Sequence, residues 1–383
     1  MKQICKKELC TGCTACANIC THGAISMQPD ESGYLHPIIN QTLCVDCGLC
    51  TRVCPVCHPQ LRHNIEKCYA AVLLEENELL SCSSGGVATA LARHILEKGG
   101  IVYGCSAKDI THVCHKRIGT ADGIEELKGS KYVQSDLGDV YKQIKTDLRS
   151  SIPVLFIGTP CQVAGLYGYL RTDYDNLYTA DLVCHGVPSQ KMLNENIAYY
   201  PSDGSIVSFR RKKRSSKGYK IEFGLDRYNP VTGKNLFSPY NRDFYMFGFL
   251  RCLTFRENCY TCAYANNKRV ADITLCDFWG LSPNAGFDLG KGVSAILVST
   301  KKGEQIVEAV RDSLNIKERE VAEATRWNDQ LNRPSTKPKR YEKFIELYSH
   351  SSFRSSMMKA YYLEFIYDRY IHYKNRLKKL LLR

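Results

Sequence analysis

Short apolar segments of strand length alternate with segments of helical periodicity through the middle of the chain. The pattern predicts strands over residues 69–74, 101–105, 153–158 and 293–299. It predicts helices over residues 84–98, 161–170 and 304–314. Ser83 or Ser84 could cap the first helix, and Gly99-Gly100 would end it. Strands that alternate with helices indicate an α/β core.

The two ends of the chain follow different patterns. Near the start, residues 25–27 and 36–39 resemble two brief strands joined by the turn 30–33. Residues 205–226 predict a two-stranded segment. Residues 315–383 are mostly helical in pattern.

The last 33 residues form a basic segment with helical periodicity. Residues 351–383 hold eight Lys or Arg and two acidic residues. Phe365, Ile366, Tyr370 and Leu377 recur at helical spacing, which is typical of an amphipathic helix. Such a helix can lie on a membrane surface or dock a partner. The alternative is a helix that packs on its own domain.

Composition favours a folded, multi-domain protein with unusual sulfur chemistry. The chain has 383 residues, of which 44% are hydrophobic and 20 are cysteine. No apolar run is long enough for a spanning helix, and the first 20 residues lack the apolar core of a signal peptide. We therefore expect a cytoplasmic protein whose thiols stay reduced and serve as metal ligands or redox groups. The net charge of +13 permits acidic partners, anionic substrates or an anionic membrane surface.

Eight cysteines form two copies of the pattern C-x-x-C-x-x-C-x-x-x-C. The copies are Cys10, Cys13, Cys16, Cys20 and Cys44, Cys47, Cys50, Cys54. This is the bacterial ferredoxin signature for two 4Fe-4S clusters, in which the fourth cysteine serves the other cluster. The predicted ligand sets are Cys10, Cys13, Cys16 with Cys54, and Cys44, Cys47, Cys50 with Cys20. Zinc is the alternative, but zinc sites more often combine two distant cysteine pairs.

A further cysteine stands at the start of a predicted helix. In the run 158–162, Thr159 is a natural cap and Pro160 suits the first helical position. Cys161 would then lie at the positive end of the helix dipole, which favours its thiolate. The thiolate could be a cluster ligand or a nucleophile; a buried inert thiol is the alternative.

Three more cysteines could join Cys161. Cys184 lies in the run 181–189, and Cys259 and Cys262 form a C-x-x-C pair. These four thiols match the number of ligands that one additional cubane needs.

Several motifs together are similar to those of the coenzyme F-420 hydrogenase/dehydrogenase beta subunit family. They lie at residues 83–87, 129–135, 158–162, 181–189 and 259–280, and the resemblance covers roughly residues 1–300. The resemblance implies a flavoprotein that binds FAD and a third 4Fe-4S cluster, the latter through Cys161, Cys184, Cys259 and Cys262. It also implies an FAD site at Ser84, Gly85, Gly86, Lys131, Tyr132 and Gln134. The glycines would let a phosphate approach backbone N–H groups, and Lys131 would add positive charge. Without the resemblance, Ser84-Gly85-Gly86 is typical of an ordinary helix cap.

The basic run Arg210–Arg214 lies between the apparent strands of 205–226. It could hold an anionic substrate or steer an acidic redox partner such as a ferredoxin. A solvated loop is the alternative. No nucleic-acid motif accompanies the run, so nucleic-acid binding is not expected.

These patterns predict an α+β protein in four parts. Residues 1–64 form a dicluster ferredoxin-like domain, 65–150 a flavin-binding region, 151–320 a region with the third cluster, and 321–383 a basic helical tail. The predicted function is an iron–sulfur, flavin-dependent oxidoreductase. By family resemblance, its substrate would be a deazaflavin coenzyme or a glycan precursor for polysaccharide assembly. The alternatives are an electron-transfer subunit that relays electrons to a catalytic partner, and a binding protein in which the clusters are structural. The sequence indicates no catalytic residue.

Overall fold

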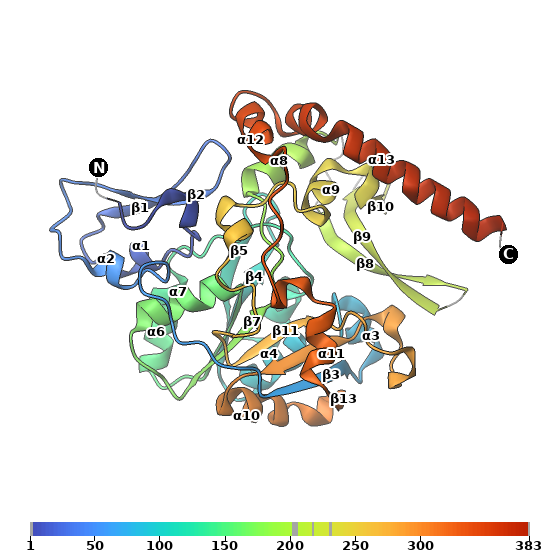
Figure 1. The fold of residues 1–383 in the computed structure, drawn as a ribbon. Helices are drawn as coiled ribbons and strands as arrows, with labels where there is room; N and C mark the ends of the chain where they lie inside the picture. The colour runs from blue at the N-terminus through green and yellow to red at the C-terminus, as the bar shows by residue number, and fades with distance from the viewer. Residues whose placement is uncertain (1–2, 201–205, 217, 230–231, 382–383) are drawn as a thin grey trace.

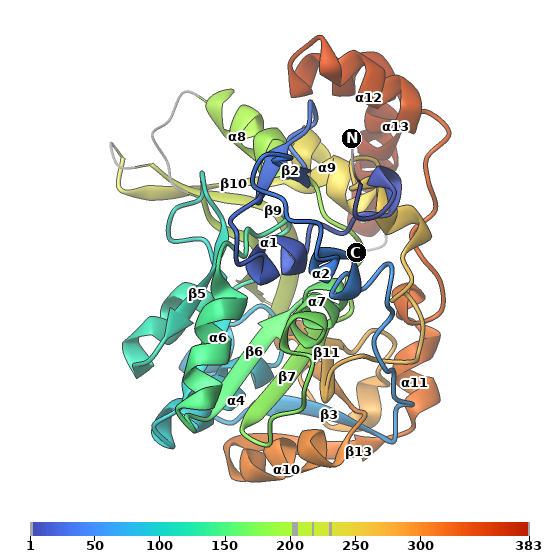
Figure 2. The same ribbon diagram turned by 90° about the vertical axis from the view of Figure 1, so that its left-hand side faces the viewer.

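The computed structural model describes residues 3–200, 206–216, 218–229 and 232–381 (Figures 1 and 2). Small parts of the segments predicted at 1–64, 205–226 and 321–383 therefore lie outside the described residues. The chain folds around a mixed sheet, against which the cysteine-rich N-terminal region packs on one side.

Eight strands form the central sheet in the order β13-β3-β12-β11-β7-β6-β4-β5. The four neighbours β11, β7, β6 and β4 run parallel, and the remaining strands pair antiparallel. Strands from residues 65–150 and 151–320 thus lie side by side in one sheet. The strands are β3 (Lys67–Leu73), β4 (Ile101–Ser106), β5 (Cys114–Ile118), β6 (Val154–Gly158), β7 (Leu177–Leu182), β11 (Ile273–Asp277), β12 (Ser294–Val298) and β13 (Leu314–Arg319).

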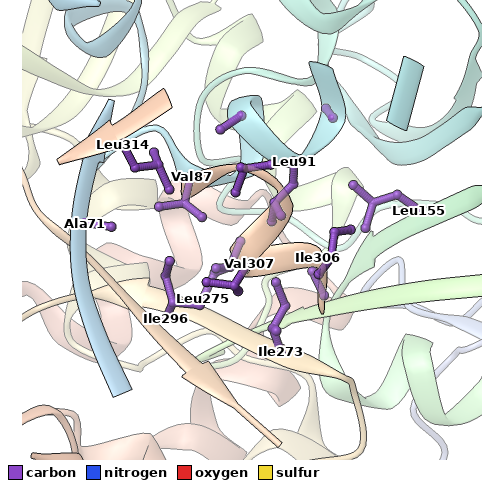
Figure 3. Packing of buried hydrophobic residues seen from close by; sticks show 14 of the residues in the cluster. Ala71, Val87, Leu91, Leu155, Ile273, Leu275, Ile296, Ile306, Val307 and Leu314 are labelled. Atoms are coloured by element: carbon purple, nitrogen blue, oxygen red, sulfur yellow. The ribbon is translucent and has the colours of Figure 1, made fainter. Parts of the chain in front are cut away.

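Helices cover both faces of this sheet, because its parallel strands are apolar on both sides. In β6, Leu155 belongs to the core cluster with α4 (Val87–Glu97) and α10 (Lys301–Ala309). Its neighbours Val154 and Phe156 belong to the cluster with α6 (Val140–Arg149) and α7 (Pro160–Leu170). Figure 3 shows the first cluster, in which strand residues meet Val87 and Leu91 of α4 and Ile306 and Val307 of α10.

The N-terminal region is a small unit that packs on α7 and α6. It contains the antiparallel hairpin β1 (Ile25–Pro29) and β2 (Leu35–Ile39), with the short helices α1 (Ala15–Ile19) and α2 (Leu49–Arg52). Ala15 and Val53 are fully buried in the same cluster as the residues of α7. The region therefore shares a core with the larger domain.

A second sheet, of three strands, lies next to the C-terminal helices. It has the order β10-β9-β8 and consists of β8 (Ile206–Ser215), β9 (Gly218–Asn229) and β10 (Lys234–Pro239). The helices around it are α8 (Gln190–Ala198), α9 (Phe244–Leu250), α12 (Tyr341–Ser349) and α13 (Phe353–Leu381). The remaining helices are α3 (Glu76–Ser81), α5 (Ile124–Leu127) and α11 (Val321–Arg326), with short 3-10 turns between elements.

Most predicted strands match the structure, but two predicted helices need correction. Helix α4 begins at Val87, and its cap is Gly86 in a left-handed conformation with φ of 81°, so neither Ser83 nor Ser84 caps it. Helix α10 ends at Ala309, and residues from Leu314 form β13 instead of a helix. The helical prediction failed there because β13 gains its hydrogen bonds from the distant strand β3. Strands β5, β7, β10 and β11 were not predicted.

In the part of the chain that the structure describes, none of the helices combines the length and apolar character needed to cross a bilayer.

Candidate redox site

Three cysteines of the first motif and the last cysteine of the second lie together in the N-terminal region. Cys10, Cys13, Cys16 and Cys54 are all buried. Burial, together with the neighbouring sulfurs of Cys10 and Cys54, raises the pKa of Cys13 to about 12. Burial likewise raises the pKa of Cys16, with Cys13, Cys10 and Cys54 as its charged neighbours. We call these four residues the inner set; its composition is that predicted for one ferredoxin cluster.

The complementary four cysteines line a separate small cavity of about 40 Å³. This outer set consists of Cys20, Cys44, Cys47 and Cys50. Cys47 is exposed, and the neighbouring apolar side chains of Leu43 and Val45 are 48% and 59% exposed. The outer set therefore lies at the molecular surface.

The third set of cysteines gathers at the carboxyl ends of adjacent parallel strands. Cys161 follows β6 and Cys184 follows β7, while Cys259 and Cys262 come from the 3-10 turn η4 (Glu257–Thr261) and its end. Loops at this edge of an α/β sheet are the usual place for ligand sites. The cysteines of this third set are electrostatic neighbours of one another.

Cys161 lies at the start of α7, with the helix cap that the sequence predicts. Thr159 caps α7 and Pro160 begins it, as predicted, and Gln162 completes a capping box. Burial nevertheless raises the pKa of Cys161 to about 12, although Thr159 hydrogen-bonds to its sulfur at 3.2 Å. Burial thus opposes the thiolate that the helix dipole favours at this position. Metal binding deprotonates a coordinating thiol, so a metal bound at Cys161 would offset this effect of burial.

A buried ion pair beneath the third set joins two of its loops. The guanidinium of Arg269 donates to Asp181 Oδ1 at 2.8 Å, and both side chains are at most 1% exposed. Arg269 also donates to the carbonyl oxygens of Tyr264 and Asn266 at 3.0 and 3.1 Å. Asp181 belongs to the strand before Cys184, and Tyr264 follows Cys262. Arg269 therefore fixes the two cysteine loops relative to each other.

Helix α7 connects the inner set with the third set. Cys161 lies in its first turn, and Gly165 lies one turn later on the same face. A Cβ added at Gly165 would lie 2.9 Å from both Cβ and Sγ of Cys13. Four residues of helix rise by about 6 Å, so the two sets are neighbours across one helical turn.

Arg256 forms a second connection between the inner set and the third set. Its side chain is buried. The guanidinium donates to the carbonyl oxygens of Cys10 at 2.7 Å and Leu35 at 3.0 Å, and to Gln134 Oε1 at 3.2 Å. A hydrogen bond with Cys5 lowers the pKa of Cys10 most, and the charge of Arg256 acts in the same direction. At Cys161 the same charge only partly offsets burial, which raises the pKa of that thiol. Among the ion pairs of the described residues, none joins Arg256 to a carboxylate. A buried cation without a carboxylate fits a site that carries negative thiolates.

One large cavity of about 600 Å³ extends from the third set across the carboxyl edge of the sheet. Its lining includes every cysteine of the third set and five of the six residues predicted to bind FAD, Gly85 being the exception. These five are Ser84, Gly86, Lys131, Tyr132 and Gln134. Such a volume is typical of sites for cofactors and small molecules.

Several of these residues are already hydrogen-bonded within the protein. Gly85 N–H donates to Ser294 Oγ at 3.0 Å, and a Cβ at Gly85 would lie 2.1 Å from the carbonyl oxygen of Ala71. Gly85 is therefore needed for backbone packing, and its N–H is bonded to Ser294 in this arrangement. Ser84 Oγ donates to the carbonyl of Val293, and Gln134 Nε2 donates to that of Thr11.

Lys131 occupies the end of a short helix. Its ammonium donates to the carbonyl oxygens of Leu127 and Lys128, both at 2.7 Å, where α5 ends. Burial lowers its pKa to about 8. The positive charge predicted at this edge of the cavity is present, but its strongest contacts are to the protein.

Other groups make the cavity suitable for an anionic, aromatic ligand. Val87 and Ala88, in the first turn of α4, line it, so the positive end of this helix faces the space. Tyr132 stacks on Phe249 with 4.2 Å between ring centroids. The buried Nε of Arg210, another lining residue, has no hydrogen-bond partner within the described structure. An unpartnered buried donor is the kind of group that an acceptor on a ligand satisfies.

The basic run 210–214 lies within strand β8 and alternates between its two faces. Arg210 is buried and pairs with Asp277 through two hydrogen bonds of 2.8 and 3.1 Å, and Lys212 donates to the carbonyl of Ser84 at 2.7 Å. Arg211 pairs with Glu222 on the other face. The solvated-loop interpretation is therefore wrong for Arg210 and Lys212, whereas Lys213 and Arg214 are exposed.

Two cysteines outside the motifs approach the inner set. Hydrogen bonds to Cys10 and Cys54 raise the pKa of Cys5, and Cys57 neighbours Cys54 and Cys50. No pattern in the sequence indicated that Cys5 lies near the inner set. Among the described residues, no group of three or more His, Cys, Asp or Glu side chains is arranged to hold a single metal ion.

Comparison with known proteins confirms the resemblance for two segments. Residues 153–324 match the family model for the C terminus of the coenzyme F420 hydrogenase/dehydrogenase beta subunit, and residues 9–57 match the 4Fe-4S dicluster domain. The chain is 25% identical over 329 residues to the coenzyme F420-dependent sulfite reductase of Methanocaldococcus jannaschii. The alignment covers 83% of this chain. The chain spans about half of that relative, 49% of its length.

A solved structure shows a weaker similarity. A chain of the F420-reducing [NiFe] hydrogenase complex from Methanosarcina barkeri aligns with 18% identity and a TM-score of 0.46, covering 78% of this chain and 91% of that one.

Proposed function

We propose that this protein is an iron–sulfur oxidoreductase that exchanges electrons between its surface and a flavin in the large cavity. The chain joins a segment that matches a 4Fe-4S dicluster domain to one that matches the C terminus of coenzyme F420 hydrogenase/dehydrogenase beta subunits. The observation that carries the proposal is the order of the three cysteine sets. The outer set lies at the surface, the inner set is buried behind it, and the third set lines the cavity.

The residues of the chain determine how these sites are held. Gly165 allows α7 to contact Cys13, and Arg256 fixes the Cys10 loop against the large domain. Arg269 fixes the loops of Cys184 and Cys262. Rigid contacts of this kind behind the ligands orient them and tune the potential of a bound metal site.

Bound 4Fe-4S clusters supply one-electron carriers, and a flavin such as FAD converts these to the two electrons of a hydride-type reaction. Around the cavity, the first turn of α4, Arg210 and Lys131 provide the positive charge that would favour a phosphate-bearing cofactor. Tyr132 and Phe249 provide an aromatic wall. No described residue is assigned a catalytic role.

The substrate we propose is a deazaflavin coenzyme of the F420 type. The relative from Methanocaldococcus jannaschii is named as F420-dependent, and the cationic lining of the cavity suits an anionic coenzyme. The alternative substrate, a glycan precursor, rests on the family resemblance alone, and no feature of the cavity favours it.

The relay hypothesis has one observation in its favour. About half of the sulfite reductase relative lies outside the match, so the chemistry on its final substrate can reside in a part that this chain does not contain. In that case the chain would pass electrons to a partner enzyme and hold no substrate.

The test is anaerobic purification with iron, sulfide and flavin quantified per chain. We expect about twelve irons, from three four-iron clusters, and one flavin. Bleaching of the visible bands by reduced F420 would support the oxidoreductase. Cys184→Ser should lose about four irons while the N-terminal clusters remain. Full iron without flavin would leave the relay hypothesis, and zinc in place of iron would refute both.

A further inference from the structure

The C-terminal half of α13 exposes an apolar stripe to solvent. The backbone departs from helical geometry at Tyr361, where φ is −132°. Among the described side chains beyond this kink, those of Phe365 and Asp368 are buried, with 5% and 6% of their surface exposed. Arg251 forms an ion pair with Asp368. Figure 1 shows α13 extending past the body of the molecule toward the C-terminus.

The exposed apolar residues lie on one face of this helix. They recur every three or four residues: Leu363, Ile366, Tyr367, Tyr370, Tyr373 and Leu377, with exposures between 40% and 70%. At about 100° per residue these positions form a single stripe, on the opposite side from Phe365 and Asp368. The stripe spans fifteen residues, so its first and last members are roughly 21 Å apart along the helix. The helix thus uses one side to pack on its domain and leaves a second apolar side uncovered.

The stripe is bordered by positive charge alone toward the C-terminus. Residues 369–383 contain six Lys or Arg and no Asp or Glu. Among them, Lys374 and Lys378 are exposed and lie on the same side of the helix as the stripe. The two acidic side chains on this part of the helix are both paired, Asp368 with Arg251 and the exposed Glu364 with Arg340 at 3.5 Å.

These features fit an anionic lipid surface. Tyrosine rings with one polar end are enriched where a bilayer meets water, and lysine side chains extend from an apolar face toward headgroups. An interfacial helix combines such an apolar face with flanking cations and is too polar to cross the bilayer. We propose that residues 363–378 of α13 bind the protein to anionic membrane surfaces, with the stripe buried at the headgroup boundary.

The test is flotation of the intact chain, purified anaerobically, with vesicles of phosphatidylcholine alone or with 30% phosphatidylglycerol. Binding should require the anionic lipid and weaken as salt rises. Lys374→Gln with Lys378→Gln should weaken binding about thirtyfold, because each basic residue near an anionic surface contributes a factor of about five. Tyr367→Ser with Tyr370→Ser should weaken it at least about tenfold, because these rings supply the buried area.

A matched control separates this site from the general charge of the protein. Lys213→Gln with Arg214→Gln removes the same charge from exposed positions on β8 and should leave binding unchanged. Iron content and circular dichroism would verify that each variant folds. Equal binding to neutral vesicles, equal loss in the control, or no binding to either vesicle would overturn the proposal. Retention by an acidic ferredoxin that depends on the same tyrosines, without vesicle binding, would assign the stripe to a protein partner. The proposal does not depend on the redox function, so either can fail alone.

Discussion

The inner and outer cysteine sets come from the same repeated motif but occupy opposite environments. The inner set is buried between the N-terminal region and α7, in contact with the core of the large domain. The outer set lies around a small surface cavity and exposes Cys47. The difference shows that the motif specifies which atoms can bind iron, whereas packing against another domain specifies which site is connected to the cavity.

Each set also has an arginine that donates to the carbonyl oxygen of one of its cysteines. Arg256 donates to Cys10 at 2.7 Å and is buried, whereas Arg52 donates to Cys47 at 2.9 Å from an exposed position. The contacts are chemically alike, but water screens only the second. The two arginines therefore place the same charge in a buried and in a solvent-exposed environment, and their effects can be compared.

The contact between α7 and the inner set gives the largest expected effect. Gly165→Leu should displace Cys13, because even a Cβ at this position lies within 2.9 Å of Cys13 Sγ and of the Tyr141 hydroxyl. We expect loss of about four of twelve irons and at least about a hundredfold slower electron transfer from the surface to the cavity. Gly48→Asn is the control in the outer half: Gly48 has φ of 71° and open space around it, and asparagine tolerates this conformation. Full iron content in Gly165→Leu would contradict the assigned contact.

Exposure should separate the two sets in their rates of iron loss. When the anaerobic protein is challenged with a chelator, about four irons should leave first, at least roughly tenfold faster than the rest, because Cys47 is exposed and the inner set is not. Absorbance of the iron–chelator complex measures both phases. Cys47→Ser should lack the fast phase. A single phase for all irons would show that the two sets do not differ in accessibility.

The two arginines should affect the reduction potentials unequally. Arg256→Gln removes a buried charge next to Cys10 and should lower the potential of the inner cluster by on the order of 50–100 mV. Arg52→Gln should shift the outer cluster by less than about 20 mV, because the lost charge is exposed to solvent. Redox titration followed by electron paramagnetic resonance measures both. Equal shifts in the two variants would refute the role of burial.

The smallest effects are expected at the two cysteines outside the motifs. Cys5→Ala and Cys57→Ala should each retain about twelve irons, since four motif cysteines already complete each set. Iron analysis and the cluster spectra measure the outcome. Loss of four irons in either variant would show that this cysteine replaces a motif ligand.

The sequence determined the chemistry of this protein because the relevant signals are local. The two-residue spacing of the cysteines predicted the dicluster region, and Thr159-Pro160 predicted the start of α7 where the structure has it. The alternation of apolar segments predicted β3, β4, β6 and β12, since buried strands are apolar over their whole length.

The tertiary structure decided what depends on distant pairing. Strand β13 and the parallel strand β11 exist through hydrogen bonds to partners far away in the chain. Arg256 contacts the carbonyl of Cys10 across 246 positions, and Gly165 meets Cys13 through close packing of two domains. Close packing of Gly85 against the backbone of β3 likewise depends on the fold and not on the local sequence. The spacing of cysteines along the chain determines which of them can bind one cluster. Only the folded structure determines which cysteine sets lie next to each other and which charged side chains are buried.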